Sequence, residues 1–267
     1  MYLYLYDALV GDKKHEKTIV RIEHRLTDLG INGRIARSTI LTNPKIIVRD
    51  AIRRGVKTVV AVGGDSLIHS IITSLVGTDA ALGIIPLGDN QSLANILGIP
   101  KNEAACDVLS ARKIEYIDLG KINNTYFLTS ASVLSDAIKI TCDGNFTVQP
   151  VKKKSQTSVY NFREMPDDTP PAYRHFFNPQ DGILEATIEP LGFSLTNNIL
   201  KTFGKERSPK IDRIDSIFPI KKVRIESTEP DKSIPVIVDG QPMLETPVTI
   251  EVAPQKLKVI VGKGRLF

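Results

Sequence analysis

The sequence predicts a two-domain α/β protein, with an N-terminal parallel βα domain followed by a C-terminal antiparallel β-sandwich domain. Strand-like and helix-like segments alternate along the first part of the chain, which is the pattern of βα units in a parallel sheet. After Gly120 the helical spacing stops, and short β-rich runs follow one another between turn residues. We therefore expect domains at residues 1–120 and 121–267, with a C-terminal tail that is able to pack back on the first domain.

The elements of the first domain follow from periodicity and from helix start and stop signals. Asn43 and Pro44 predict a helix start, because asparagine caps helices and proline suits their first turn. The run Thr58–Val62 is apolar and β-branched, as in a strand that is buried on both faces. The other predicted elements are a strand at Tyr2–Tyr6, a helix at Glu16–Leu29, a short strand around Ile35, a helix at about Leu67–Leu75 and a strand at Ala81–Ile85.

The second domain is predicted from short strands. Asn123 and Asn124 form an expected hairpin turn between Ile114–Leu119 and Thr125–Thr129. Residues 150–180 are polar and proline-rich, and we interpret them as a long loop or insertion. The later strand-like runs are Ile183–Ile188, Lys222–Ile225, Ile234–Val238, Thr246–Val252 and Leu257–Val261.

Composition excludes some classes of protein and leaves others open. With 42% apolar and 24% charged residues the chain is globular rather than disordered. Its net charge of +5 favours anionic partners, but no nucleic-acid motif accompanies it, so we expect no nucleic-acid partner. The N-terminal apolar run is too short to span a membrane, and Cys106 and Cys142 show no metal-ligand spacing. A cytoplasmic setting is the expectation.

Two groups of lysines leave membrane contact open. Lys152–Lys154 and Lys221–Lys222 are clusters that would attract an acidic lipid surface, which would place the protein peripherally at the inner membrane face. An equally good interpretation is that these are solvated lysines of surface loops. A homodimer is also left open by the sequence.

Two glycine-rich loops follow predicted strands and are candidate ligand sites. In a parallel sheet, ligands bind beyond the carboxyl ends of the strands. The first loop is Gly63-Gly64-Asp65-Ser66, where glycines admit a phosphate to the backbone and the following helix start favours an anion. Asp65 would reach a metal ion or a ribose hydroxyl. The alternative is a tight βα turn in which Asp65 or Ser66 caps the helix.

The second loop is Gly88-Asp89-Asn90-Gln91-Ser92, which follows the predicted strand Ala81–Ile85. Its alternative interpretation is an ordinary loop with Ser92 as a helix cap. Together the two loops would face one ligand, and Asp65 and Asp89 are the candidate magnesium ligands.

Several segments, in order along the chain, resemble the diacylglycerol kinase and sphingosine kinase families. GGDSL resembles their GGDGT motif, and PLGDNQSLANILGIP is similar to the P-x-GT-x-ND-x-AR-x-LGIP stretch of the lipid kinases. IDLGKINNTYFLTSAS, NPQDGILEATI and VIVDGQP also have counterparts there, so the similarity extends from about Arg49 to Val261. The resemblance implies a diacylglycerol kinase-like or NAD kinase-like fold that binds ATP and Mg²⁺.

The sequence departs from the family pattern at several catalytic positions. Ser66 and Leu67 replace the glycine and threonine of GGDGT, and Asp89, Gln91 and Ser92 stand where GT-x-ND has threonine, asparagine and aspartate. Gln241 stands where the family has the glutamate that is thought to act as general base. Retained positions include Gly63, Gly64, Asp65, Gly88, Asp136, Asp239 and Gly240.

The resemblance implies ATP-dependent phosphorylation of a lipid hydroxyl, such as that of diacylglycerol or a sphingoid base. The residues assigned to catalysis are Asp136, Asp239 and Gln241 at the altered base position. A neutral amide accepts no proton at neutral pH, so one alternative is a catalytically impaired pseudokinase that binds nucleotide and lipid. Another is an NAD kinase-like enzyme.

Overall fold

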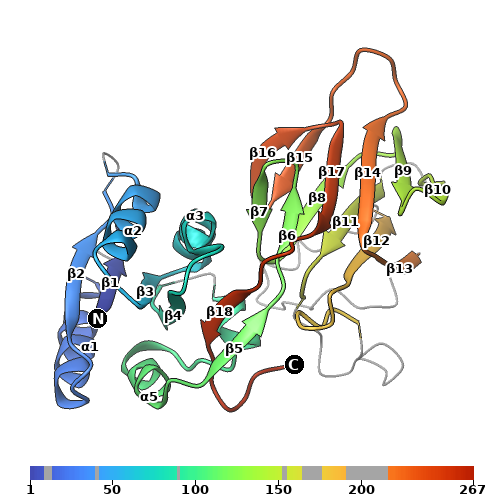
Figure 1. Ribbon diagram of the computed structural model, residues 1–267. Coiled ribbons are helices and arrows are strands. Elements are labelled where there is room, and N and C mark those ends of the chain that lie inside the picture. Colours follow the sequence, from blue (N-terminus) through green and yellow to red (C-terminus); the bar gives the residue numbers. More distant parts are fainter. Residues whose placement is uncertain (9–13, 40–41, 89–90, 152–154, 164–175, 191–215) are drawn as a thin grey trace, which may run out of the picture. The chain divides into compact units, whose positions relative to one another are not determined.

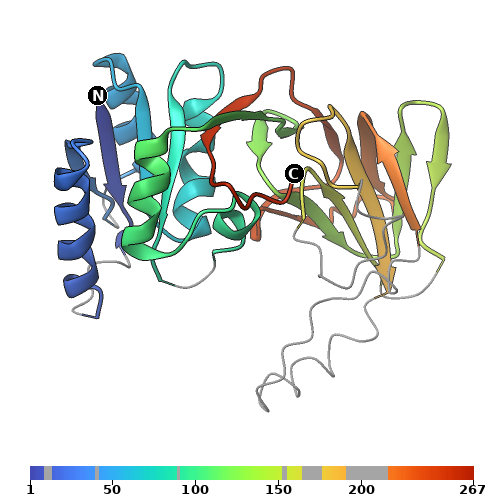
Figure 2. The ribbon, with the colours of Figure 1, turned by 90° about the horizontal axis from the view of Figure 1, so that it is seen from below.

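The computed structural model describes residues 1–8, 14–39, 42–88, 91–151, 155–163, 176–190 and 216–267 (Figures 1 and 2). The chain forms two compact units. The first comprises Met1–Ile117 together with Gln255–Phe267, and the second comprises Asp118–Pro254.

The first unit is built on a sheet of strand order β2-β1-β3-β4-β18-β5. The strands are β1 (Tyr2–Tyr6), β2 (Gly33–Arg37), β3 (Thr58–Gly63), β4 (Ala81–Pro86), β5 (Ile114–Ile117) and β18 (Leu257–Ile260). Neighbouring strands run parallel from β2 to β18, and β5 is antiparallel to β18. Every residue of β3 and β4 is buried, as the apolar run in β3 predicts.

Helices cover both faces of this sheet. Figure 1 shows α2 and α3 on one face and α1 and α5 on the other. The helices are α1 (Glu16–Asp28), α2 (Pro44–Arg53), α3 (Asp65–Leu75), α4 (Ser92–Ile96) and α5 (Ala105–Ala111), with a 3₁₀ turn η2 at Asn102–Ala104. The start of α2 is as predicted, because the Asn43 side chain accepts a hydrogen bond from Lys45 N at 3.0 Å.

The second unit contains two antiparallel sheets of strand order β10-β9-β14-β17-β6-β7 and β13-β12-β11-β8-β15-β16. The strands of the first are β6 (Gly120–Ile122), β7 (Thr125–Phe127), β9 (Ile138–Cys142), β10 (Phe146–Val148), β14 (Lys222–Ser227) and β17 (Val248–Val252). Those of the second are β8 (Ser130–Leu134), β11 (Ser155–Tyr160), β12 (Leu184–Pro190), β13 (Ser216–Ile220), β15 (Pro235–Val238) and β16 (Gln241–Glu245).

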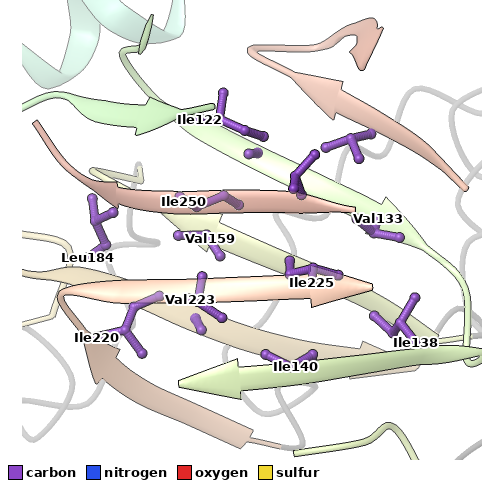
Figure 3. Close-up of a cluster of buried hydrophobic side chains, with 14 of the residues drawn as sticks. Ile122, Val133, Ile138, Ile140, Val159, Leu184, Ile220, Val223, Ile225 and Ile250 are labelled. Carbon is purple, nitrogen blue, oxygen red and sulfur yellow. The ribbon is translucent and has the colours of Figure 1, made fainter. Parts of the chain in front are cut away.

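The two sheets of the second unit share one apolar core. Figure 3 shows Val133, Val159 and Leu184 from one sheet together with Ile140 and Ile250 from the other. All are almost fully buried, which is the packing of a β-sandwich. The predicted fold class, a parallel βα domain plus an antiparallel β-sandwich domain, is confirmed.

Two element predictions were wrong. Ser155–Tyr160 falls in the stretch interpreted as a loop, yet it is the central strand β11, paired with β8 and β12. The run Ile114–Leu119 is not a hairpin arm: β5 joins the sheet of the first unit, and the partner of β7 across Asn123-Asn124 is β6. Among the described residues, no helix has the length and apolar character needed to cross a bilayer.

Candidate functional site

The two glycine-rich loops lie side by side at one edge of the first unit's sheet. Their strands, β3 and β4, are parallel neighbours in which Gly63 is paired with Pro86. One residue further, Leu87 N donates to Gly63 O at 3.2 Å. Both loops therefore start at the carboxyl ends of adjacent strands, where ligands of parallel sheets bind.

The first loop leads directly into α3. A Cβ added to Gly63 would lie 2.7 Å from the Cβ of Asp7, so only glycine fits there. Gly64 is the residue before the helix, and no side chain caps the first turn of α3. The interpretation of Asp65 or Ser66 as the cap is thus not seen, and the positive end of the helix dipole lies beside the glycines.

Asp65 connects the two loops. It is the first residue of α3, and its Oδ2 accepts a hydrogen bond from Leu93 N, in the first turn of α4, at 3.4 Å. In the second loop Gly88 has a φ of +89°, and its carbonyl accepts from Gln91 Nε2 at 2.5 Å. Gln91 Oε1 is buried and accepts no hydrogen bond within the part of the chain that the structure describes. Asp89 lies outside the described residues.

Ser66 and Leu67, which the motif resemblance aligns with the glycine and threonine of GGDGT, are helical. Ser66 is exposed in the first turn of α3 and is not among the described residues with positive φ, so a strain that glycine would relieve is absent. Leu67 points into the core and is 4% exposed. Leu67 therefore offers no hydroxyl, whereas Ser66 carries an exposed one in the first turn of α3.

Asp7 is a carboxylate that the sequence analysis did not include among the candidate site residues. It directly follows β1, the neighbour of β3, and its N–H donates to Val62 O at 3.0 Å. Its side chain lies against Gly63. The signal that could have found it is its position, because an acidic residue immediately after a central parallel strand lies at the same sheet edge as the loops.

In the second unit, Asp239 and Gly240 form the turn between β15 and β16. Val238 and Gln241 are paired across it, and φ is +48° at Asp239 and +78° at Gly240, as in a two-residue type I′ hairpin. Gln241 is the first residue of β16, and it is exposed.

The Asp239 carboxylate accepts hydrogen bonds from a neighbouring segment of the chain. It accepts hydrogen bonds from Leu128 N at 2.9 Å, from Thr129 N at 2.8 Å and Thr129 Oγ1 at 2.6 Å, and from Ser130 N at 3.2 Å. A carboxylate that accepts several N–H bonds is stabilised in its charged form and orders the segment that donates them. In the structure Asp239 therefore holds the connection between β7 and β8.

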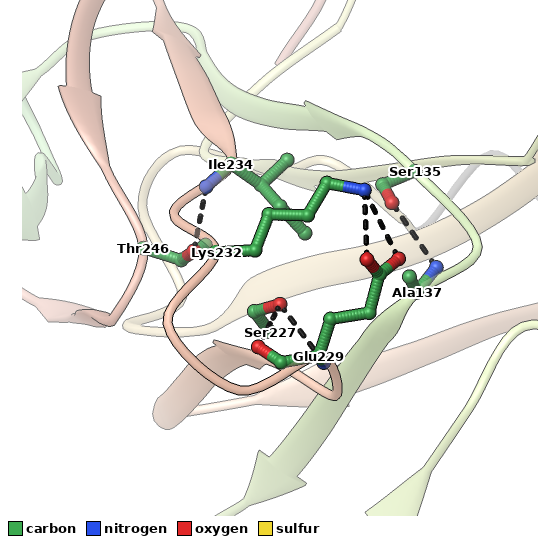
Figure 4. A network of polar contacts seen from close by, with 7 residues as sticks. All are labelled: Ser135, Ala137, Ser227, Glu229, Lys232, Ile234 and Thr246. Carbon is green, nitrogen blue, oxygen red and sulfur yellow. Dashed lines mark hydrogen bonds and ion pairs between the residues drawn. The ribbon is translucent and has the colours of Figure 1, made fainter.

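Asp136 is not brought together with Gln241. It lies in the turn after β8, in which Ala137 N donates to Ser135 Oγ at 3.0 Å. Val238, beside the Asp239 turn, is paired with Ala131 near the start of β8, so Asp136 and Gln241 lie toward opposite ends of that strand. Figure 4 shows the polar contacts around the Ser135–Ala137 turn, including Lys232 with Glu229 at 2.9 Å.

Glu185 on β12 is a buried acid that the sequence analysis did not single out. It is 2% exposed, and its Oε2 accepts no hydrogen bond from the described residues. Burial raises its pKa from the ordinary 4.5 to about 8, although the backbone N–H of Phe177 bonds to the carboxyl and works in the opposite direction. Glu185 is thus largely protonated at neutral pH.

The comparison with protein families finds a match in the N-terminal part of the chain. Residues 1–122 match the diacylglycerol kinase catalytic domain. The N-terminal part of the chain is therefore similar to the diacylglycerol kinase catalytic domain. The match covers β1 to β6 and includes both glycine-rich loops.

Relatives with similar sequences include proteins named as lipid kinases and diacylglycerol kinases. A probable YegS-like lipid kinase of Pseudomonas aeruginosa is 24% identical over 249 residues, covering 82% of this chain and 81% of that protein. A diacylglycerol kinase of Bacillus subtilis is 25% identical over 131 residues, covering 48% of this chain and 43% of that protein.

Solved structures share the fold. A diacylglycerol kinase from Bacillus anthracis has a TM-score of 0.74 at 18% identity, covering 98% of this chain and 97% of that one. Yeast NADH kinase, solved with NADH, has a TM-score of 0.57 at 11% identity, covering 100% of this chain and 85% of that one. At these identities the likeness establishes the diacylglycerol kinase and NAD kinase fold alone.

Proposed function

We propose that the first unit binds ATP and that the protein transfers its terminal phosphoryl group to the hydroxyl of a lipid such as diacylglycerol or a sphingoid base. The observation that carries the proposal is the pairing of two glycine-rich loops at adjacent strand ends, beside the uncapped start of α3. Lipid is proposed as the acceptor because the relatives from Pseudomonas aeruginosa and Bacillus subtilis are named as lipid and diacylglycerol kinases.

In this proposal the phosphates lie at the Gly63-Gly64 turn. Gly63 leaves room for the Asp7 side chain, and the N-terminal N–H groups of α3 that follow Gly64 favour the negative charge of a phosphate. Leu87 N bonds to Gly63 O and Leu93 N bonds to Asp65 Oδ2, so these two positions are fixed against the first loop before the nucleotide binds.

The residues present fit a nucleotide that binds together with Mg²⁺. Asp7 and Asp65 lie at the same sheet edge as the glycines, and Asp89 follows Gly88 in the sequence. Carboxylates would repel phosphates unless a cation lay between them, and Mg²⁺ prefers a few carboxylates plus phosphate oxygens. When bound, Mg²⁺ neutralises charge on the transferred group. Within the described residues no three His, Cys, Asp or Glu side chains form a metal site by themselves, so Asp65 and Asp89 are proposed to share the ion with the phosphates.

Gln241 is proposed to limit the rate. A general base contributes about 10²–10⁴ in rate, and a neutral amide cannot accept the proton of a lipid hydroxyl. Asp239 is an unsuitable substitute, because its carboxylate already accepts four hydrogen bonds. This supports a second candidate function, a pseudokinase that binds nucleotide and lipid with little turnover.

The test has a binding arm and a transfer arm. Differential scanning fluorimetry with ATP or ADP, with and without Mg²⁺, should show a nucleotide-dependent rise in Tm that is lost in Asp65→Ala. Asp79→Ala is the matched control, because Asp79 is exposed and contacts Lys258 rather than either loop. No response to millimolar nucleotide in the wild type would exclude the binding site.

The transfer arm uses labelled ATP with diacylglycerol, sphingosine and other lipid alcohols in mixed micelles. Slow phosphorylation of one of them supports the lipid kinase, and binding without any transfer supports the pseudokinase. NAD⁺ as acceptor tests the NAD kinase-like alternative, and transfer to NAD⁺ alone would overturn the choice of a lipid.

Contact with acidic membranes remains part of the proposal. Among the lysines that suggested this contact, Lys222 Nζ lies 3.4 Å from Glu251 Oε2, so the carboxylate offsets part of the lysine charge. Lys152–Lys154 lie outside the described residues. Binding to vesicles that contain acidic lipid should weaken as salt rises. A lack of binding at low salt would remove this part.

A further inference from the structure

We propose that Asn161 is a positioning residue that fixes the Asp239-Gly240-Gln241 turn, and so deepens the proposed function, on which it rests. Asn161 directly follows β11 and is fully buried, with 0% exposure. Nothing in its local sequence marks it. Its importance comes from what it contacts.

Asn161 bonds to the carbonyls of the connection between β7 and β8. Its Nδ2 donates to Leu128 O at 2.9 Å, and its backbone N–H donates to Thr129 O at 2.8 Å. The same Nδ2 also donates to Asp118 O at 2.7 Å, at the start of the second unit. One amide group therefore ties three separate segments together.

Asp239 bonds to the same connection from its other side. The Asp239 carboxylate accepts hydrogen bonds from the N–H groups of Leu128, Thr129 and Ser130. The backbone N–H of Asp239 donates to Ser130 O at 2.8 Å. With the Asn161 bonds, every backbone N–H and C=O from Leu128 to Ser130 has a partner on Asn161 or Asp239. Peptide groups that leave water lose stability when they are unpaired, so this full pairing holds the connection in one conformation.

The consequence for Gln241 follows from the turn. Asp239 is held at both its carboxylate and its N–H, and Gln241 is only two residues further along a tight hairpin turn. The direction in which Gln241 leaves the turn is thus set by the connection that Asn161 holds. If Gln241 touches the reacting group, as proposed, Asn161 acts on the reaction through it.

Two variants test this inference. Asn161→Asp keeps the size but cannot donate to Leu128 O or Asp118 O. Thr129→Val keeps the shape and removes only the hydroxyl bond to Asp239, so it perturbs the same connection even if Asn161→Asp folds poorly. The matched control is Thr157→Val on β11, because Thr157 is equally buried and its hydroxyl has no partner among the described residues.

The first measurement is hydrogen exchange, resolved by peptide, well below the unfolding temperature. We expect exchange at residues 128–130 and 239–241 to rise at least 10-fold in both variants, with no comparable rise in β9 and none in the control. An equal rise in β9 would mean that Asn161 stabilises the whole unit and positions nothing, which overturns the inference.

The second measurement is lipid phosphorylation. The comparison is made in the Gln241→Glu background, where the turn carries a group that can accept the proton. Adding Asn161→Asp there should lower kcat about 10-fold while KM for ATP stays unchanged, because the nucleotide loops are not perturbed. Faster hydrogen exchange at residues 239–241 together with an unchanged kcat would overturn the inference. If the wild type phosphorylates no lipid, the proposed function fails by itself, and the exchange result still decides whether Asn161 positions the turn.

Discussion

Gly98 and Gly262 pack backbone against backbone, so that a Cβ built on Gly262 would lie 1.8 Å from the carbonyl oxygen of Gly98. The segment after β18 is held there by two hydrogen bonds, from Gly262 N to Leu97 O and from Leu266 N to Ile96 O, each 2.9 Å. It thereby supports α4, whose first turn bonds to Asp65.

Replacing Gly262 by alanine should destabilise the first unit. The added methyl group forces the two backbones apart, at a cost of at least ~1–3 kcal/mol, and Tm should fall by several degrees. The nucleotide-induced shift in Tm should shrink as well, because α4 moves with the segment. Gly264→Ala is the control, since a Cβ at Gly264 meets nothing within 4 Å. Equal Tm values for the two variants would contradict this account.

Replacing Gln241 by glutamate should raise kcat without changing stability. The side chain is exposed, so the new charge is solvated and Tm should stay within about 1 °C of the wild type. If residue 241 is the base position, as proposed, a base there is worth up to about 10²–10⁴ in rate. Because the motif resemblance also marks Ser66 and Leu67 as departures, we expect the lower end of that range. The measurement is initial phosphorylation rate, with the exposed Gln255→Glu as the matched change elsewhere.

Adding Ser66→Gly and Leu67→Thr to Gln241→Glu should change the stability of the protein as well as its phosphorylation rate. Ser66→Gly places glycine in a helix at a cost of up to ~1 kcal/mol, and Leu67→Thr removes a leucine that is 4% exposed. The phosphorylation rate and the Tm of the triple variant, which combines Gln241→Glu, Ser66→Gly and Leu67→Thr, must therefore be measured together. A triple variant that is both faster and as stable as the wild type would show that the role given to Leu67 in the core is wrong.

Asp136→Asn should leave phosphorylation within about twofold of the wild type. Asp136 is exposed and lies toward the far end of β8 from Gln241, so it can neither orient Gln241 directly nor replace it within that turn. Initial rates measured between pH 6 and 9 check this. A large loss of kcat would show that Asp136 takes the proton and that the assignment of Gln241 is mistaken.

Replacing Glu185 by glutamine should stabilise the protein progressively as the pH rises above 4.5. The folded pKa of about 8 lies above the ordinary 4.5, so the contribution of Glu185 to stability is fully present below pH 4.5 and is lost as pH rises through 8. Glutamine avoids this loss, which is on the order of a few kcal/mol at pH 9, and its amide oxygen can still accept from Phe177 N. Thermal melts should coincide at pH 5 and separate at pH 9. If the difference in Tm between the variant and the wild type were the same at pH 5 and at pH 9, Glu185 would be ionised in the folded state.

Local patterns were sufficient for most of the first unit and insufficient for part of the second. Helix caps and buried β-branched runs are local signals, and they predicted α2 and β3 closely. β11 was missed because its Ser, Thr and Gln residues read as loop, although Ser158 and Thr157 are buried by their neighbours in the sheet. The pairing of β18 with β4 joins residues that are distant in sequence, which periodicity does not reveal.

The site was predicted to a similar extent. The adjacency of the two loops follows from strand order, and the structure shows it. The motif resemblance grouped Asp136, Asp239 and Gln241, but sequence order gives neither the direction of β8 nor the partners of a carboxylate. The hydrogen bonds of Asp239 and the role of Asn161 depend on segments that meet only in the folded sheet.

The positions of β5 and β18 make the second unit an insertion that can be excised. Ile117 and Leu257 are paired neighbours in the first unit, and Gly120 and Val252 are paired neighbours in the second. Paired residues of antiparallel strands lie about 5 Å apart, so a hairpin loop of a few residues between Ile117 and Leu257 would close the first unit without the rest. Each unit could then be encoded as one uninterrupted gene segment, and the proposed nucleotide site could be studied apart from the sandwich.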